Sequence, residues 1–176
     1  MTRVYVAVGS NVEPEKNLAA AWRALSARWP GAVVSSVYRS APVGFDGDDF
    51  LNCVVGFDTA EPLAAVLEQL HAIEAQCGRP RSAPQYGPRR MDLDVLLFGD
   101  LRGEFPGAVL PRPDLLRRAY MLGPLAEIAP DLQHPTAGQT IGELWRRFDR
   151  AAHPLTRVAV PGLPMRPATV RASDAV

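Results

Sequence analysis

Two aspartates, Asp92 and Asp94, alternate with apolar residues in a strand-like run at residues 91–98. Because successive side chains of a strand point to opposite sides, the two carboxylates face the same way, roughly 7 Å apart. Carboxylate oxygens at this spacing suit a magnesium ion, or two ions held close together. Arg89 lies just before the run, where its planar guanidinium can reach an anion held by the same metal. The pattern therefore favours a site for phosphate chemistry.

The solvated face of an ordinary strand is the alternative interpretation of this spacing. Aspartate is a poor strand former, however, and the neighbouring residues are strongly apolar. Two like charges side by side on a half-buried strand also repel each other unless a cation compensates them. These features together favour a chemical role for Asp92 and Asp94.

Transfer of a phosphoryl or diphosphoryl group depends on positioning and on charge neutralisation by metal ions and guanidinium groups. Lys16 is the only lysine, so phosphates must be held by arginines or by backbone amides. Residues 9–11, Gly-Ser-Asn, lack the lysine and the spacing of a Walker phosphate loop. The three histidines share no metal-ligand spacing and are expected at the surface or at caps: His71, His134 and His153.

The composition is that of an ordinary globular protein. With 176 residues, 47% of them hydrophobic, and a formal net charge of zero, the chain is expected to form one domain. The neutral balance predicts no nucleic-acid partner, and no stretch has the length and apolarity of a membrane span or a signal sequence. Cys53 and Cys77 are interpreted as core thiols in a reducing compartment. We therefore expect a cytoplasmic monomer.

The elements expected around the aspartates follow the order βαββαβ. Valine-rich or alternating runs predict strands at residues 3–8, 32–39, 50–57 and 91–98. Helical spacing of apolar residues predicts helices from about Pro14 to Trp29 and from Pro62 to Gly78. This order is typical of an α+β ferredoxin-like sandwich, in which helices cover one face of an antiparallel sheet. The other face would be open, with the two aspartates pointing into it.

The C-terminal part is expected to add short helices near residues 114–118, 124–128 and 139–149. From about residue 154 the chain loses periodicity and becomes rich in proline. The sequence therefore predicts a single catalytic domain at residues 1–153, followed by a poorly ordered tail at residues 154–176 that has no chemical role.

The segment from Arg89 to Asp94, preceded by Tyr86-Gly87-Pro88, resembles the signature of the 6-hydroxymethyl-7,8-dihydropterin pyrophosphokinases, a family of folate-pathway enzymes. The similarity runs from about residue 3 to residue 150, and its motifs are specific as a set although each alone is weak. The other segments that agree in order and spacing are Val8–Asn11, Tyr38–Gly44, Phe50–Asn52, Glu74–Arg81, Arg118–Tyr120 and Pro124–Pro130.

The resemblance implies an ATP-dependent diphosphokinase, which transfers the terminal diphosphate of ATP to the hydroxymethyl oxygen of the pterin and releases AMP. It also implies ATP as co-substrate and two Mg²⁺ ions as cofactors, with Asp92 and Asp94 as their ligands. Arg79 and Arg89 would stabilise the moving diphosphate. The implied catalytic residues are therefore Arg79, Arg89, Asp92 and Asp94, and Asp92 can also help to deprotonate the hydroxyl group.

Two sets of binding residues are implied in the same way. The pterin ring would lie between two aromatic side chains, while an amide and backbone groups contact its polar edge. The implied pterin residues are Ser40, Ala41, Val43, Phe50, Asn52 and Tyr120. The implied ATP-binding residues are Glu74, Arg81, Tyr86, Val95, Arg112 and Arg118, with Tyr86 in a lid.

Arg112 is the main departure from the family pattern, since a histidine that contacts nucleotide usually follows the proline at position 111. Arginine can grip a phosphate or stack on adenine, but it cannot act as a neutral imidazole. We expect the change to affect nucleotide affinity rather than reaction type. The loop at residues 45–49 is also more acidic than expected, which can influence closure of the site.

Two other functions stay open on the sequence. A ferredoxin-like binding module, for RNA or for a regulatory small molecule, would not require an Asp-x-Asp pair beside Arg89. An RNA platform would also need aromatic residues on its central strands, where the first strand offers only Tyr5. A pyrophosphokinase that has lost catalysis through the change at Arg112 would bind pterin without releasing AMP.

Overall fold

The computed structural model describes residues 1–44, 46–77 and 91–164. The strands are β1 (Thr2–Ser10), β2 (Val33–Val34), β3 (Val37–Ser40), β4 (Phe50–Thr59), β5 (Asp92–Phe98), β6 (Gly103–Phe105), β7 (Ala108–Leu110) and β8 (Thr156–Val158). The helices are α1 (Pro14–Arg28), α2 (Leu63–Gln76), the short 3-10 helix η1 (Pro113–Leu116), α3 (Ala119–Ile128) and α4 (Ile141–Arg147). Within these described ranges, no helix has the length and apolarity that crossing a membrane requires.

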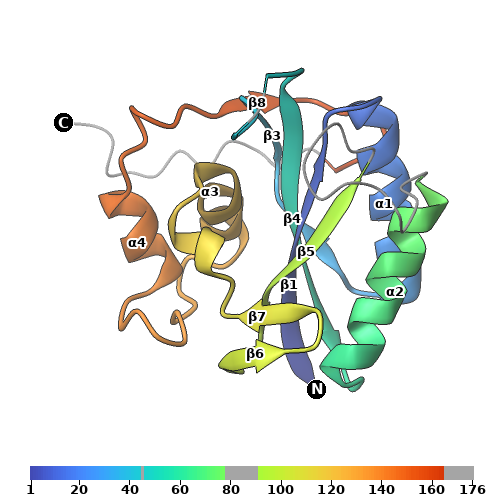
Figure 1. The fold of residues 1–176 in the computed structure, drawn as a ribbon, viewed down its shortest axis with the longest axis vertical. Coiled ribbons are helices and arrows are strands. Elements are labelled where there is room, and N and C mark those ends of the chain that lie inside the picture. Colours follow the sequence, from blue (N-terminus) through green and yellow to red (C-terminus); the bar gives the residue numbers. More distant parts are fainter. Residues whose placement is uncertain (45, 78–90, 165–176) are drawn as a thin grey trace.

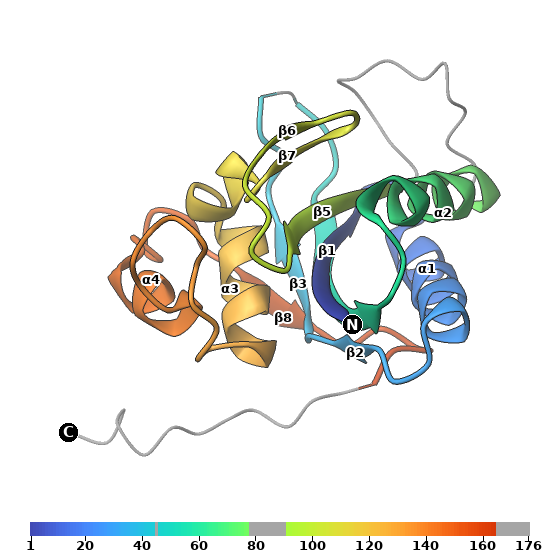
Figure 2. The same cartoon turned by 90° about the horizontal axis from the view of Figure 1, so that it is seen from below.

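The main sheet has the strand order β5-β1-β4-β3-β8, and every pair along it is antiparallel. Strands β1, β3, β4 and β5, with α1 and α2 as connections, form the arrangement expected from the sequence, so the ferredoxin-like α+β fold is confirmed. β2 pairs with β4, and β6 and β7 form a separate hairpin. Helices α1 and α2 lie side by side on one side of the sheet (Figures 1 and 2).

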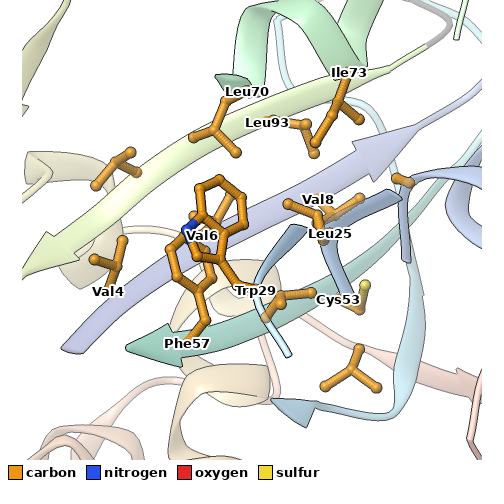
Figure 3. Packing of buried hydrophobic residues seen from close by; sticks show 14 of the residues in the cluster. Val4, Val6, Val8, Leu25, Trp29, Cys53, Phe57, Leu70, Ile73 and Leu93 are labelled. Carbon is orange, nitrogen blue, oxygen red and sulfur yellow. The ribbon is translucent and has the colours of Figure 1, made fainter. Parts of the chain in front are cut away.

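The face toward α1 and α2 is lined by apolar side chains. The even-numbered positions of β1, from Val4 to Val8, meet Leu25 of α1 and Leu70 of α2, which are at most 1% exposed (Figure 3). The rings of Trp29 and Phe57 stack in the same cluster, with centroids 4.0 Å apart. Full burial of one such apolar side chain contributes about 1.5–3 kcal/mol. This group, called the α1–α2 cluster below, is the larger of the two apolar clusters of the described residues, and its burial stabilises the fold.

The opposite face of the sheet is not open along its whole length, so that expectation from the sequence is wrong. Tyr5, Ala7 and Val54 pack there in a second apolar cluster with residues of η1, α3 and α4. Figure 1 shows α3 and α4 on the side of the sheet away from α1 and α2. An apolar sheet face must be buried against another layer, and the C-terminal helices supply that layer.

Strand β8 corrects the prediction of a poorly ordered tail from residue 154. Residues 156–158 pair with β3, and Val160 and Leu163 are buried in the α1–α2 cluster. The edge of β3 presents backbone donors and acceptors that another strand can satisfy, even when that strand has no apolar periodicity. Residues 165–176 lie outside the described part of the chain.

The strand expected at residues 32–39 is divided into β2 and β3 by Ser35 and Ser36. The Ser35 hydroxyl accepts a hydrogen bond from the Val54 amide at 2.9 Å and donates one to the Ser36 carbonyl at 2.8 Å. A serine hydroxyl competes in this way with the regular ladder. At the break, Glu127 of α3 accepts hydrogen bonds from the Ser36 amide, at 2.6 Å, and from the Tyr38 hydroxyl. This carboxylate therefore ties α3 to the sheet.

Candidate active site

Strand β5 places both aspartates on the same face of the sheet, as the sequence predicts. In the ladder with β1, Asp92 lies opposite Gly9 and Asp94 lies opposite Ala7. The residue between them, Leu93, points to the other side and is buried in the α1–α2 cluster. Both aspartates are partly exposed, so a ligand can reach their carboxylates.

Glu74 of α2 holds the backbone between the two aspartates. Its Oε1 accepts a hydrogen bond from the Leu93 amide at 2.9 Å, and the glutamate is buried. β5 is an edge strand of the main sheet, so its outward amides have no strand partner among the described residues. A buried amide needs an acceptor, and Glu74 supplies it. The family resemblance implies a role on the nucleotide side for Glu74, which stays a prediction. The observed contact positions the strand that carries Asp92 and Asp94.

Arg112 lies beside Asp94. Its amide donates a hydrogen bond to the Leu96 carbonyl at 3.0 Å, which holds the residue against β5. The guanidinium Nη1 lies 3.6 Å from Asp94 Oδ1, and Nη2 lies 3.6 Å from Asp114 Oδ2. The three side chains are each about one-third exposed, so solvent weakens both ion pairs. The Nε atom of Arg112 is buried and has no hydrogen-bond partner among the described residues.

Asn52 of β4 is a buried amide on the same face of the sheet. Its Nδ2 donates a hydrogen bond to Ser40 Oγ at 2.7 Å. A Cβ atom on Gly9 would lie 2.9 Å from Asn52 Oδ1, so the glycine makes room for the amide. Gly9 is opposite Asn52 in one ladder and opposite Asp92 in the other. The amide and the carboxylate therefore flank Gly9, roughly 10 Å apart at two strand spacings.

Tyr120 of α3 is within electrostatic reach of the same group. Burial raises the pKa of its hydroxyl and is the largest influence on it. The guanidinium groups of Arg118 and Arg112 lower that pKa. The carboxylates of Asp114 and Asp94 raise it. This ring, the two arginines and Asp94 are therefore close enough to influence one another, and their roles in binding stay predictions.

The remaining predicted residues of the described part occupy more peripheral positions. Phe50 begins β4 and is partly exposed, whereas Ala41 and Val43 are exposed in the loop after β3, with Val43 at 47%. The side chain of Val95 faces the α1–α2 cluster, on the opposite side from Asp94. Only the backbone of Val95 can therefore serve a ligand on the aspartate face.

Four predicted site residues lie outside the described part of the chain: Arg79, Arg81, Tyr86 and Arg89. Their roles in binding ATP and in moving the diphosphate stay predictions. The segment that contains them is connected in the sequence to Glu74 on one side and to Asp92 on the other.

Sequence reasoning missed two residues of the site, Gly9 and Asp114. Gly9 follows Tyr5 and Ala7 on the same face of β1, so the side chains become smaller toward the polar end of the strand. Asp114 stands two residues after Arg112, and an acid so close to the unusual arginine was a signal for an ion pair. Neither signal alone specifies which neighbour each residue contacts.

The donor set fits a hard divalent cation. Mg²⁺ is usually bound through one or two carboxylates together with waters and substrate phosphates, and Asp92 and Asp94 provide such carboxylates. Within the described ranges, no group of three or more His, Cys, Asp or Glu side chains could hold a metal. The protein groups therefore suit an ion that is shared with phosphate oxygens better than a closed structural metal site.

Fold and site together define a class of protein. The chain is a ferredoxin-like α+β sandwich whose edge strand presents two carboxylates beside an arginine, with a buried amide on the same face. These are the parts of an enzyme that transfers phosphate groups to a small polar substrate.

Comparison with known proteins agrees with this class. The family model described as 7,8-dihydro-6-hydroxymethylpterin-pyrophosphokinase (HPPK) matches residues 5–130. The 2-amino-4-hydroxy-6-hydroxymethyldihydropteridine pyrophosphokinase of Pseudomonas aeruginosa is 42% identical over 147 residues, which cover 81% of this chain and 89% of that protein. The protein of the same name from Methylorubrum extorquens is 39% identical over 153 residues, covering 85% and 95% of the two chains.

Solved structures support the fold. Wild-type HPPK-DHPS of Plasmodium falciparum is similar with a TM-score of 0.62 at 12% identity, covering 83% of this chain and 44% of that chain. HPPK-DHPS in complex with substrates is similar with a TM-score of 0.63 at 12% identity, covering 82% and 43%. This chain therefore spans less than half the length of those HPPK-DHPS chains. With the family match and the curated relatives, the chain belongs to the 7,8-dihydro-6-hydroxymethylpterin-pyrophosphokinase family, and it is an ATP-dependent enzyme.

Proposed function

We propose that this chain transfers diphosphate from ATP to the hydroxymethyl group of 6-hydroxymethyl-7,8-dihydropterin, giving AMP and the pterin diphosphate in folate biosynthesis. Family membership supports the reaction. The observation that supports its location is the arrangement on one sheet face, where Asp92 and Asp94 lie on the same side as Asn52, and Arg112 and Tyr120 are near Asp94.

The pterin side of the site is built around Asn52. One of its Nδ2 hydrogens is donated to Ser40. Among the described residues this leaves the second hydrogen and Oδ1 to pair with the polar edge of a flat heterocycle. The rings of Phe50 and Tyr120 offer aromatic faces on which such a heterocycle can stack. A buried polar group left unpaired costs about 1–3 kcal/mol, so a ligand that pairs with the amide is favoured over one that does not.

The phosphate side is built around Asp92 and Asp94. Two magnesium ions held by these carboxylates would neutralise the phosphate oxygens of ATP and align them for displacement. Arg112 and Arg118 bind phosphate oxygens from the protein side, since a guanidinium matches their geometry. Asp92 shares the ladder position of Gly9 with Asn52, so it is the aspartate nearer the pterin side and can accept the hydroxyl proton.

The residues outside the described ranges complete the proposal through the family resemblance. Arg79 and Arg89 stabilise the diphosphate as it moves, and Arg81 and Tyr86 serve the nucleotide side and the lid. Val95 contributes through its backbone. We also propose that the chain acts as a monomer in the cytoplasm.

Purified chain, assayed for AMP release, tests the proposed reaction. We expect AMP to form only when ATP, Mg²⁺ and the hydroxymethyl-dihydropterin are all present. Fluorescence or calorimetric titration with the pterin is run in parallel. Binding of the pterin without any AMP would contradict the proposal and would support a binding protein that has lost catalysis.

A further inference from the structure

We propose that Arg112 is an internal counter-ion for Asp94, which competes with the divalent cation for that carboxylate until nucleotide arrives, and that Asp114 limits this competition. The proposal rests on the proposed function, because it takes Asp94 as a metal ligand. It concerns the protein before nucleotide binds, a state about which the proposed reaction says nothing.

The geometry of the guanidinium carries the first step. Arg112 spans two carboxylates at equal distance, with 3.6 Å from Nη1 to Asp94 and 3.6 Å from Nη2 to Asp114. A cation that binds Asp94 must share the carboxylate with this positive charge or displace it. Attraction of the Arg112 guanidinium to Asp114 weakens the ion pair between Arg112 and Asp94. The two aspartates therefore act on Arg112 in opposite directions.

The backbone keeps Arg112 at this place. Its amide donates to the Leu96 carbonyl at 3.0 Å, and its carbonyl accepts from the Leu115 amide at 3.1 Å. Prolines at positions 111 and 113 stand on both sides of the residue and restrict the chain. The side chain can change rotamer, but its Cα stays beside β5. The backbone therefore keeps the guanidinium within reach of Asp94.

The Nε atom shows why nucleotide relieves the competition. This donor is buried and has no hydrogen-bond partner among the described residues, so the guanidinium is incompletely satisfied between its two aspartates. A phosphate oxygen bound near Asp94 offers Arg112 an acceptor of the geometry that guanidinium prefers. Binding of the cation and binding of the nucleotide are then coupled, each favouring the other. Free cation binds weakly, and cation together with nucleotide binds well.

Titration of the nucleotide-free chain with Mn²⁺, followed by the electron paramagnetic resonance signal of the free ion, tests the proposal without an activity assay. Arg112→Gln should bind Mn²⁺ about two- to fivefold more tightly than wild type, the range expected for a partly exposed ion pair. Asp114→Asn should bind it more weakly, because Asp94 is then the one remaining carboxylate partner of Arg112 among the described residues. In the presence of a non-hydrolysable ATP analogue, the advantage of Arg112→Gln should disappear.

Arg117→Gln is the matched control, since it removes the same charge from an exposed residue of the same segment. Equal Mn²⁺ affinity of Arg112→Gln and wild type, or an equal gain in Arg117→Gln, overturns the counter-ion role. Asp94→Asn separates this failure from that of the proposed function. If Asp94→Asn loses Mn²⁺ affinity while Arg112→Gln is unchanged, only the counter-ion role fails. If Asp94→Asn binds Mn²⁺ like wild type, the metal assignment fails and the inference fails with it.

Discussion

The two faces of the main sheet are made from alternate residues of the same strands, yet they have different chemistry. Toward α1 and α2, β1, β4 and β5 present a mainly apolar surface. Toward α3, the apolar surface covers only part of the sheet and gives way to Gly9, Asn52 and Asp92, which lie side by side on three strands. The first face maintains the fold, and the polar end of the second is where we propose that the reaction takes place.

Loss of the Asp94 carboxylate is expected to have the largest effect. It should lower turnover without lowering the stability of the fold. Asp94→Ala removes a proposed metal ligand, so turnover should fall by several orders of magnitude, beyond the roughly 10²–10³-fold loss typical of one charge-stabilising group. The melting temperature should stay close to that of wild type, since the side chain is partly exposed. AMP release and a thermal melt measure the two effects.

Asp58→Ala is the matched control for Asp94→Ala. It removes an exposed carboxylate from β4, where Asp58 pairs with Arg3 at 3.1 Å, outside the proposed site. Its turnover should equal that of wild type. A well-folded Asp94→Ala protein with unchanged AMP production would show that the polar end is not the metal site.

Truncation of Leu25 should lower the stability of the fold without lowering turnover. Leu25 is 0% exposed in the α1–α2 cluster, and Leu→Ala at such a position costs about 2–5 kcal/mol of the free energy of unfolding. Turnover per folded molecule should not change, because the residue faces away from the aspartates. Urea unfolding and an active-site titration measure the two quantities. A turnover that falls beyond the folded fraction would mean that the faces are not independent.

A methyl group at Gly9 should produce a smaller and more selective effect. In Gly9→Ala the new Cβ would lie 2.9 Å from Asn52 Oδ1, so the amide must move. We expect the KM for the pterin to rise roughly tenfold, the size of one lost hydrogen bond, while the KM for ATP stays the same. Because the change acts through Asn52, combining it with Asn52→Ala should add little further loss. If the losses caused by Gly9→Ala and Asn52→Ala simply add in the double variant, Gly9 does not act through Asn52.

Mild acid should have the smallest effect, through His134 in the segment that connects α3 to α4. Burial lowers the pKa of His134, whose Nδ1 accepts hydrogen bonds from the amides of Thr136 and Ala137 at 3.2 and 3.0 Å. The fold therefore favours neutral imidazole. Its contribution is fully present above the unfolded pKa of about 6.5, and it is lost as the pH falls below that value toward the lowered pKa.

Urea midpoints measured from pH 8 down to pH 5 check this dependence. His134→Gln should reduce the slope, whereas His71→Gln on the exposed side of α2 should leave it unchanged. Equal slopes for wild type and His134→Gln would assign the acid sensitivity to other groups.

The sequence predicted the part of the fold that depends on local patterns. Helices α1 and α2 begin and end close to the expected residues, and Asp92 and Asp94 share a face as alternation requires. Prediction from the sequence failed where a contact between distant segments decides whether a strand forms or breaks. β8 forms because the edge of β3 is available, and the break between β2 and β3 involves Glu127, which is 91 residues from Ser36 in the chain.

By itself, the sequence determined the family, the βαββαβ order and the side of the strand on which the two aspartates lie, because alternation and helical spacing are properties of short segments. Only the tertiary structure decided what surrounds those aspartates. Gly9 and Asn52 meet Asp92 through two ladders, and Arg112 reaches Asp94 because its amide is bonded to β5. Such neighbours come from separate elements, and no local period encodes which of them will pack together.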